Sequence, residues 1–234
     1  MADVNCYGQL VSQRGGVVPL LNTAQTENSE EETKTDSNFV GSTQTAGTFA
    51  TQQHGVYVLS KAGIICENDF NYAFIRSSGK IKAALPMGTG IAGGSHALPA
   101  PLPYAKALAS GDQVITMAAA TSDRTSSVSV ACTNGEYHVF SVTPSGSGEH
   151  EFISVLDGAS GIGLVLQGLT ISHWMAASGN NDAEITSPVY LLDGAGIPTA
   201  SLVFTGSGSG TGMRFQPTRA QVMLNSRLVY RTDA

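Results

Sequence analysis

Glycine-rich segments are the first residues in this sequence whose types could do chemistry. The segment GTGIAG, residues 88–93, has the glycine spacing of a dinucleotide-binding loop. Such a loop needs a helix directly after it, because the helix N-terminus faces the pyrophosphate. Here Pro99, Pro101 and Pro103 follow and forbid that helix. A second segment, TGSGSGTG at 205–212, lacks the Lys-Ser/Thr ending of a phosphate-binding loop and reads as a turn.

Metal-ligating and acid–base side chains are present but scattered. The histidines do not fall at metal-ligand spacing on one strand face, and the cysteines form no C-x-x-C pair. The acid pairs 67/69 and 182/184 would each share one face of an extended strand, whereas glycoside hydrolysis needs two acids facing each other across a groove. His150, between Glu149 and Glu151, reads as part of a solvated turn. We therefore expect no metal, no cofactor and no enzyme activity.

Trp174 is the only tryptophan and follows a long apolar run at 162–172, separated from it by His173. It has two interpretations, because a large ring can pack in a core or interface, or stack on a sugar. In the second interpretation Trp174 is a ligand platform. The protein is then a carbohydrate- or receptor-binding β-sandwich module of a fibre or extracellular assembly, with an exposed groove near Trp174 or Tyr190.

The charge pattern opposes nucleic-acid binding. The net charge is −6 and only 13% of residues are charged, whereas nucleic-acid binding needs a basic stripe that displaces counterions. Acids are in excess over the first 55 residues, and a basic C-terminal strand carries Arg214, Arg219, Arg227 and Arg231. This asymmetry is either chance in a low-charge protein, or a pairing of the acidic arm with the basic strand of its own or a neighbouring subunit.

Short apolar runs separated by turn residues organise the chain, most regularly from residue 55 to residue 234. The Ser/Thr-rich composition and the 27 glycines suit an all-β protein better than a helical one. Runs at 8–11, 17–21, 56–60 and 80–85 read as strands; the run at 70–76 reads as a strand with a helix as the alternative; and 104–110 reads as one or two helical turns. The spacing predicts an antiparallel β-sandwich, with a jelly roll as a candidate topology.

Turn residues predict three hairpins in the second half of the chain. The clearest joins 126–132 to 136–142 through Asn134-Gly135, a pair that accepts the positive φ angles of a type I′ turn. A second is expected between 150–156 and 162–172, around Asp157-Gly158, and a third between 189–192 and 200–204, around Asp193-Gly194.

Residues 23–53 are so polar that their composition is typical of a disordered segment. Such a segment becomes ordered only if its backbone and its few apolar residues find a surface. Phe39, Val40 and Phe49 are spaced to fill small pockets, with extended backbone between them. We therefore divide the chain into an extended arm, residues 1–54, and a β-sandwich domain, residues 55–234. The surface that holds the arm belongs either to the same subunit or to a neighbouring one, and we favour the neighbour, since exchanged arms lock symmetric assemblies.

In its lysine-poor, Ser/Thr/Gly-rich β composition and its polar arm, the chain resembles structural proteins of virions, such as bacteriophage head-decoration (cement) and jelly-roll capsid proteins. The resemblance implies a structural role in a virion, with copies of itself, as a trimer or larger assembly, and other shell proteins as partners. The arm is acidic, which favours a position between subunits or over the outside of a shell. No signal peptide and no membrane-length apolar run is found in the sequence, so we expect synthesis in a host cytoplasm and no membrane partner.

Overall fold

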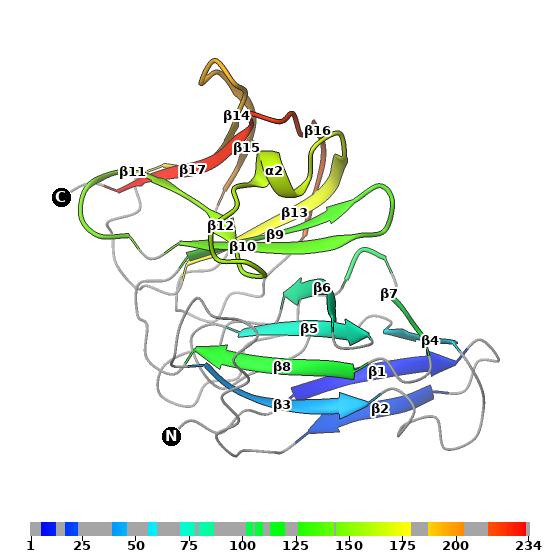
Figure 1. Ribbon diagram of the computed structural model, residues 1–234. Coiled ribbons are helices and arrows are strands. Elements are labelled where there is room, and N and C mark those ends of the chain that lie inside the picture. Colours follow the sequence, from blue (N-terminus) through cyan, green and yellow to red (C-terminus); the bar gives the residue numbers. More distant parts are fainter. Residues whose placement is uncertain are drawn as a thin grey trace.

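The protein is a β-protein, as the computed structural model shows (Figure 1). The structure describes residues 6–12, 17–22, 39–45, 56–59, 71–77, 80–86, 102–104, 106–109, 113–119, 126–142, 144–178, 187–203 and 215–232. Within these residues one short helix accompanies the strands, and every strand pairing is antiparallel.

The first half of the chain contributes two sheets. Their strands are β1 (Cys6–Ser12), β2 (Val17–Asn22), β3 (Phe39–Thr45), β4 (Val56–Leu59), β5 (Asn71–Ser77), β6 (Lys80–Pro86), β7 (Lys106–Ala109) and β8 (Gln113–Ala119). The order is β2-β1-β4-β7 in one sheet and β3-β8-β5-β6 in the other. The predicted strands at β1, β2, β4 and β6 are confirmed, and so is the strand interpretation of β5 over the helix alternative.

The helical turns expected at 104–110 are wrong, because residues 106–109 form β7 and pair with β4. The residues of β7, KALA, are good helix formers. A segment this short cannot offset the cost of nucleating a helix by itself. Main-chain pairing with β4 therefore decides the conformation.

The second half of the chain forms the sandwich. Its elements are β9 (Ser126–Cys132), β10 (Tyr137–Val142), β11 (Gly148–Glu151), β12 (Ile153–Ser154), α2 (Ile162–Val165), β13 (Thr170–Ser178), β14 (Val189–Leu192), β15 (Pro198–Leu202), β16 (Gln216–Gln221) and β17 (Arg227–Thr232). One sheet has the order β12-β10-β9-β13-β16 and the other β11-β17-β14-β15. These two antiparallel sheets confirm the all-β, sandwich-like fold, while the jelly-roll topology stays a prediction.

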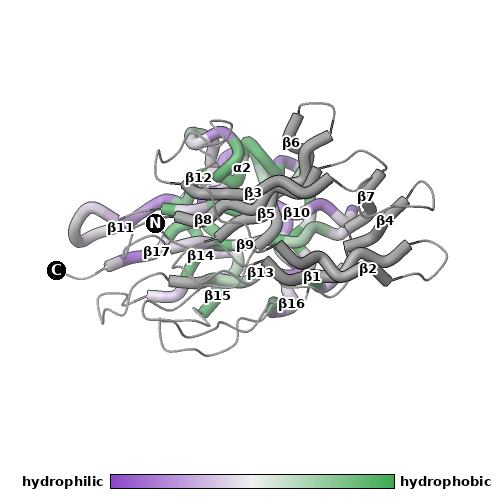
Figure 2. The backbone as a smooth tube through the Cα atoms, turned by 90° about the horizontal axis from the view of Figure 1, so that it is seen from below, coloured by the Kyte–Doolittle hydropathy of each residue, from purple (hydrophilic) through white to green (hydrophobic). Residues whose placement is uncertain are grey.

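The apolar core of the sandwich lies between these two sheets and α2. Figure 2 shows hydrophobic stretches along β9 and hydrophilic ones along β11. Because side chains alternate along a strand, every second residue points into the core. The five-stranded sheet contributes Val128, Val130, Cys132, Phe140, Ile171 and Trp174, the four-stranded sheet Val189, Leu191, Leu202, Leu228 and Tyr230, and the segment of α2 Ile162 and Leu166.

Strand β9 is buried on both of its faces, although its alternating sequence SSVSVAC predicts only one buried face. The second face carries Ser127, Ser129 and Ala131. Tyr137 of β10 pairs with Ala131, points to the same side and is fully buried. Strand β6 lies against β10, on the side away from the sheet β11-β17-β14-β15 (Figure 1). The cover over this second face comes from the first half of the chain, which local patterning does not reveal.

Two of the three predicted hairpins are confirmed. In the β9–β10 hairpin the turn differs from the expected type I′ turn, because the Gly135 N–H donates to the Cys132 carbonyl at 2.9 Å. This makes a three-residue loop with Gly135 in the left-handed region at φ +83°. The β14–β15 hairpin closes around Asp193, whose Oδ1 accepts the N–H groups of Ala195 and Ile197 at 2.9 and 2.8 Å.

The hairpin predicted around Asp157-Gly158 is wrong. Strand β12 pairs with β10 rather than with β13, and residues 162–165 form α2. The Asp157 Oδ1 accepts the N–H groups of Ala159 and Ser160, which turns the chain toward α2. A short apolar run has no period that separates a buried strand from a buried helix.

Candidate functional site: assembly surfaces

Strand β3 brings the predicted arm residues Phe39 and Val40 to the edge of a sheet. They pair with Ala119 and Ala118 of β8, and the register continues without a shift to Thr45 opposite Gln113. In the sheet order β3-β8-β5-β6, β3 is the outer strand. The third predicted arm residue, Phe49, lies outside the described residues.

The ladder between β3 and β8 explains how so polar a segment contains a strand. The residues of β3, FVGSTQT, include Thr and Ser, which tolerate extended geometry. Antiparallel pairing satisfies backbone N–H and C=O groups whatever the side chains are. The pairing with β8 therefore satisfies the main chain of β3 whatever side chains the strand carries.

The predicted boundary at residues 54/55 separates strands that are paired with one another. Strand β1 pairs with β4, and β3 pairs with β8. The first 54 residues therefore contribute strands to both sheets of the first half, and in the structure they pair with their own chain. The division into an arm and a sandwich domain stays a prediction.

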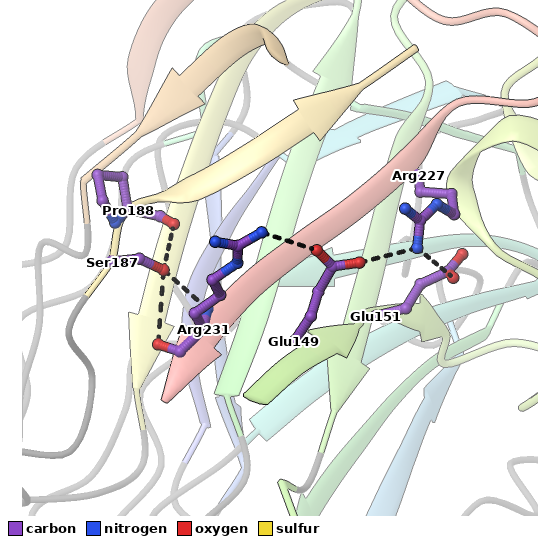
Figure 3. A network of polar contacts seen from close by, with 6 residues as sticks. All are labelled: Glu149, Glu151, Ser187, Pro188, Arg227 and Arg231. Carbon is purple, nitrogen blue, oxygen red and sulfur yellow. Dashed lines mark hydrogen bonds and ion pairs between the residues drawn. The ribbon is translucent and has the colours of Figure 1, made fainter. Parts of the chain in front are cut away.

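Four charged side chains form a cluster on β11 and β17, shown in Figure 3. The Arg227 Nη1 lies 2.9 Å from the Glu149 Oε1 and 3.9 Å from the Glu151 Oε2. The Arg231 Nη2 lies 3.5 Å from the Glu149 Oε2, and these two residues are directly opposite in the strand register. Glu149 thus bridges both arginines and ties the edge strand β11 to β17.

The serine hydroxyl of Ser187 extends this network to the backbone. The Arg231 N–H donates to the Ser187 Oγ at 2.7 Å, and this hydroxyl donates to the Pro188 carbonyl at 3.0 Å. These contacts fix the end of β17 beside the segment that enters β14 (Figure 3).

The predicted pairing between the acidic arm and the basic strand has different outcomes at its four arginines. Arg227 and Arg231 are paired with β11, which provides acids that sequence reasoning placed in a turn. Each exposed pair contributes only about 0.2–1 kcal/mol of stability. Arg219 of β16 is exposed, and no ion pair joins it to another described residue. Arg214 lies outside the described residues.

His150 lies within β11 rather than in the solvated turn that its neighbours suggest. Its Nε2 lies 2.9 Å from the Gly146 carbonyl and 2.9 Å from the Thr232 Oγ1. A carbonyl only accepts, so the Nε2 carries a proton and donates to it. The imidazole therefore helps to close the loop before β11 against the end of β17.

Trp174 is in the core, and its side chain is 2% exposed. This position agrees with the packing interpretation. A sugar platform needs an exposed ring face, and the ring of Trp174 offers none. The ligand-platform interpretation thus finds no support at this residue.

Tyr137 is a polar anchor that sequence reasoning missed. Its hydroxyl accepts the N–H of Tyr104 at 2.7 Å and donates to the carbonyl of the same residue. Burial is the main reason that the pKa of the Tyr137 phenol is raised to about 12. The rings of Tyr104 and His173 meet edge to face at 5.4 Å, as do those of Tyr137 and Phe215 at 6.4 Å. The alternation of β10 predicts a buried Tyr137, but not its distant partner Tyr104.

The remaining candidates from the sequence are not among the residues that the structure describes. The two glycine-rich segments at 88–93 and 205–212 and the acid pairs 67/69 and 182/184 lie outside the described residues. Among the residues that the structure describes, no group of three or more His, Cys, Asp or Glu side chains could hold a metal ion. In the same residues no helix is long and apolar enough to cross a membrane.

Comparisons of this chain with protein-family models, curated proteins and solved structures gave no match.

Proposed function

We propose that the protein is a structural assembly protein of a virus-like shell, of the decoration (cement) or capsid kind. In this proposal the N-terminal segment 1–54 joins neighbouring subunits, and the sandwich forms the body of each subunit. The observation that carries the proposal is the edge strand β3, a strand within a polar segment that adds to β8 in continuous antiparallel register.

Strand addition is a way in which one subunit can hold another. The edge of β8 offers the same N–H and C=O groups to the β3 of any copy, so exchange between copies keeps every main-chain bond. Residues 23–38 join β2 to β3, and an extended chain of that length reaches up to about 50 Å. Exchange of β3 therefore needs a neighbour whose β8 lies within reach of this connection and of residues 46–55, which join β3 to β4.

The charges favour the same role. The first 55 residues carry an excess of acids, and the net charge of the chain is −6. Arg219 is exposed on the edge strand β16 and is available to an acidic segment of a neighbour. The rival role, a carbohydrate- or receptor-binding module, lacks the exposed ring of Trp174 that motivated it.

Proline substitutions in β3 test this proposal in the intact chain. Proline removes a backbone donor and cannot sit within a paired ladder. We therefore expect Ser42→Pro with Thr43→Pro to release subunits from the assembly, as measured by sedimentation velocity. Thr33→Pro is the matched control, since it places a proline in the same polar segment but outside β3, and should leave the assembly mass unchanged.

The reactivity of Cys132 reports separately on the sandwich, because this thiol is buried in its core. Loss of the assembly with Cys132 still protected supports the proposal. An assembly that keeps its mass without a continuous β3 contradicts it.

A further inference from the structure

The β9–β10 turn carries the only Asn-Gly pair of the sequence, Asn134-Gly135. An asparagine before glycine is prone to spontaneous deamidation, because glycine has no Cβ to hinder attack by its own backbone nitrogen. Asn134 is exposed, and a Cβ on Gly135 would meet nothing within 4 Å. Water therefore reaches the side-chain amide of Asn134, and a ring formed between the two residues has room.

Deamidation at this pair is a reaction of the chain with itself and then with water. The Gly135 nitrogen attacks the Asn134 Cγ, the bond between these two atoms forms, and the Cγ–Nδ2 bond breaks. The proton of the Gly135 N–H leaves with the amine as ammonia. Water then opens the cyclic imide: opening at Cγ gives aspartate, and opening at the main-chain carbonyl gives isoaspartate, whose main chain runs through Cγ and is longer.

The folded turn holds both reacting groups out of this reaction. The Gly135 N–H donates to the Cys132 carbonyl at 2.9 Å, so the attacking nitrogen keeps its proton. The Asn134 Oδ1 accepts the Glu136 N–H at 3.1 Å, which fixes the side-chain amide. Because the attack needs a deprotonated nitrogen and an amide that can move, both hydrogen bonds must break first.

The rest of the sheet keeps the turn closed. Strand β9 lies between β10 and β13. The Thr133 N–H donates to the Thr170 carbonyl of β13 at 2.9 Å, and the Cys132 N–H donates to the Glu136 carbonyl at 2.8 Å. Cys132, directly before the turn, is fully buried. A turn anchored in this way opens together with the strands around it rather than by itself.

Isoaspartate does not fit the folded turn. The turn is a three-residue loop in which Gly135 has φ +83°. A longer main chain at position 134 lies inside the ring that the Gly135 N–H closes with the Cys132 carbonyl. The modified loop therefore cannot keep this hydrogen bond and the pairing of Cys132 with Glu136 together.

We propose that Asn134 is a latent deamidation site, which the folded β9–β10 turn protects and which reacts when the sandwich opens. Isoaspartate at this position then blocks the return to the native hairpin. The residue records unfolding as a covalent change, and an opened chain becomes irreversibly unfolded with time. This inference does not depend on the proposed assembly role, since the reaction occurs within one chain.

Incubation of the full chain at pH 8, with and without denaturant, tests the protection. Peptide mapping by mass spectrometry follows deamidation at Asn134, and methylation by an isoaspartyl methyltransferase identifies isoaspartate. We expect the reaction in denaturant to be at least about tenfold faster than in the folded chain. Equal rates in the two conditions, or no reaction at Asn134 in denaturant, overturn the proposal.

The yield of refolding tests the consequence. A chain with Cys6→Ser and Cys66→Ser is held in denaturant for increasing times and then diluted, and protection of Cys132 measures the refolded fraction. We expect this fraction to fall in step with isoaspartate at position 134. Asn134→Ser is the matched control, because serine keeps an oxygen acceptor in the turn but cannot form the imide, so its yield should stay constant. A yield that falls equally in both chains overturns the proposed block to refolding.

Discussion

The Cys132 thiol is the single group whose chemistry depends most directly on the sandwich. It is fully buried in the core, and burial, followed by the nearby charge of Glu136, raises its pKa from 9.0 to about 12. Between these pH values the folded chain keeps a proton that the unfolded chain releases. The thiol therefore adds stability below pH 9, and this contribution is lost as the pH rises toward 12.

We predict that Cys132 is unreactive in the folded chain. In a chain with Cys6→Ser and Cys66→Ser, modification by a thiol reagent at pH 8 should be about a hundredfold slower, or more, than in the same chain in denaturant, because the reactive thiolate is scarce and shielded. Absorbance of the released thiol anion measures the rate. A folded chain that reacts as fast as the denatured one would show that the core around β9 is open.

The burial of single residues was predictable from the sequence, but the residues that they contact were not. A buried Cys132 and a packed Trp174 follow from apolar surroundings and alternation. The acids that Arg227 and Arg231 meet come from β11, about eighty positions away along the chain, through strand pairing that no local pattern contains. The same holds for Tyr137 and its partner Tyr104.

At the scale of elements, the contact of α2 with the β16–β17 turn depends on the absence of one side chain. A Cβ on Gly163 would meet backbone atoms, the Leu224 oxygen at 2.3 Å and the Ser226 oxygen at 2.6 Å. Backbone cannot move aside as a flexible side chain does. We predict that Gly163→Ala lowers the free energy of unfolding by about 1–3 kcal/mol, measured by urea denaturation.

Gly161→Ala is the matched control for that prediction. A Cβ on Gly161 would meet the end of the Glu151 side chain, which can rotate away, so its cost should stay below about 1 kcal/mol. Equal losses in the two variants would mean that the close approach of α2 to Leu224 is not what the glycine permits.

Strands with turn residues on both sides were predictable, and segments without a clear period were not. The Asn-Gly and Asp-Gly turns located the hairpins of β9–β10 and β14–β15. The apolar run from Ile162 has no periodicity that separates a helix from a strand, so the prediction of a strand is wrong where α2 forms. At Lys106–Ala109 the local propensity favours a helix, but pairing with β4 makes the segment a strand.

At the scale of the whole molecule, a polar segment gains a strand by pairing with β8. Within one chain this pairing is already complete, from Phe39 opposite Ala119 to Thr45 opposite Gln113. The proposed assembly uses the same register between copies, which adds no new type of contact and changes only which chain supplies β3. Composition predicts disorder here because it reflects only how much apolar surface a segment can bury. It does not reflect the main-chain hydrogen bonds that the edge of β8 offers to β3.

A disulfide trap across β3 and β8 tests the central claim most directly. Ser42 and Thr116 are opposite in the register, so cysteines at both positions are within bonding range. The trap uses a chain that carries Cys6→Ser and Cys66→Ser, with Ser42→Cys alone and Thr116→Cys alone as controls. After mild oxidation of the assembled protein, we predict that Ser42→Cys with Thr116→Cys gives covalently linked chains on a non-reducing gel, and that neither control does. A single band of internally cross-linked monomer would contradict the account, because every β3 would then be paired within its own chain.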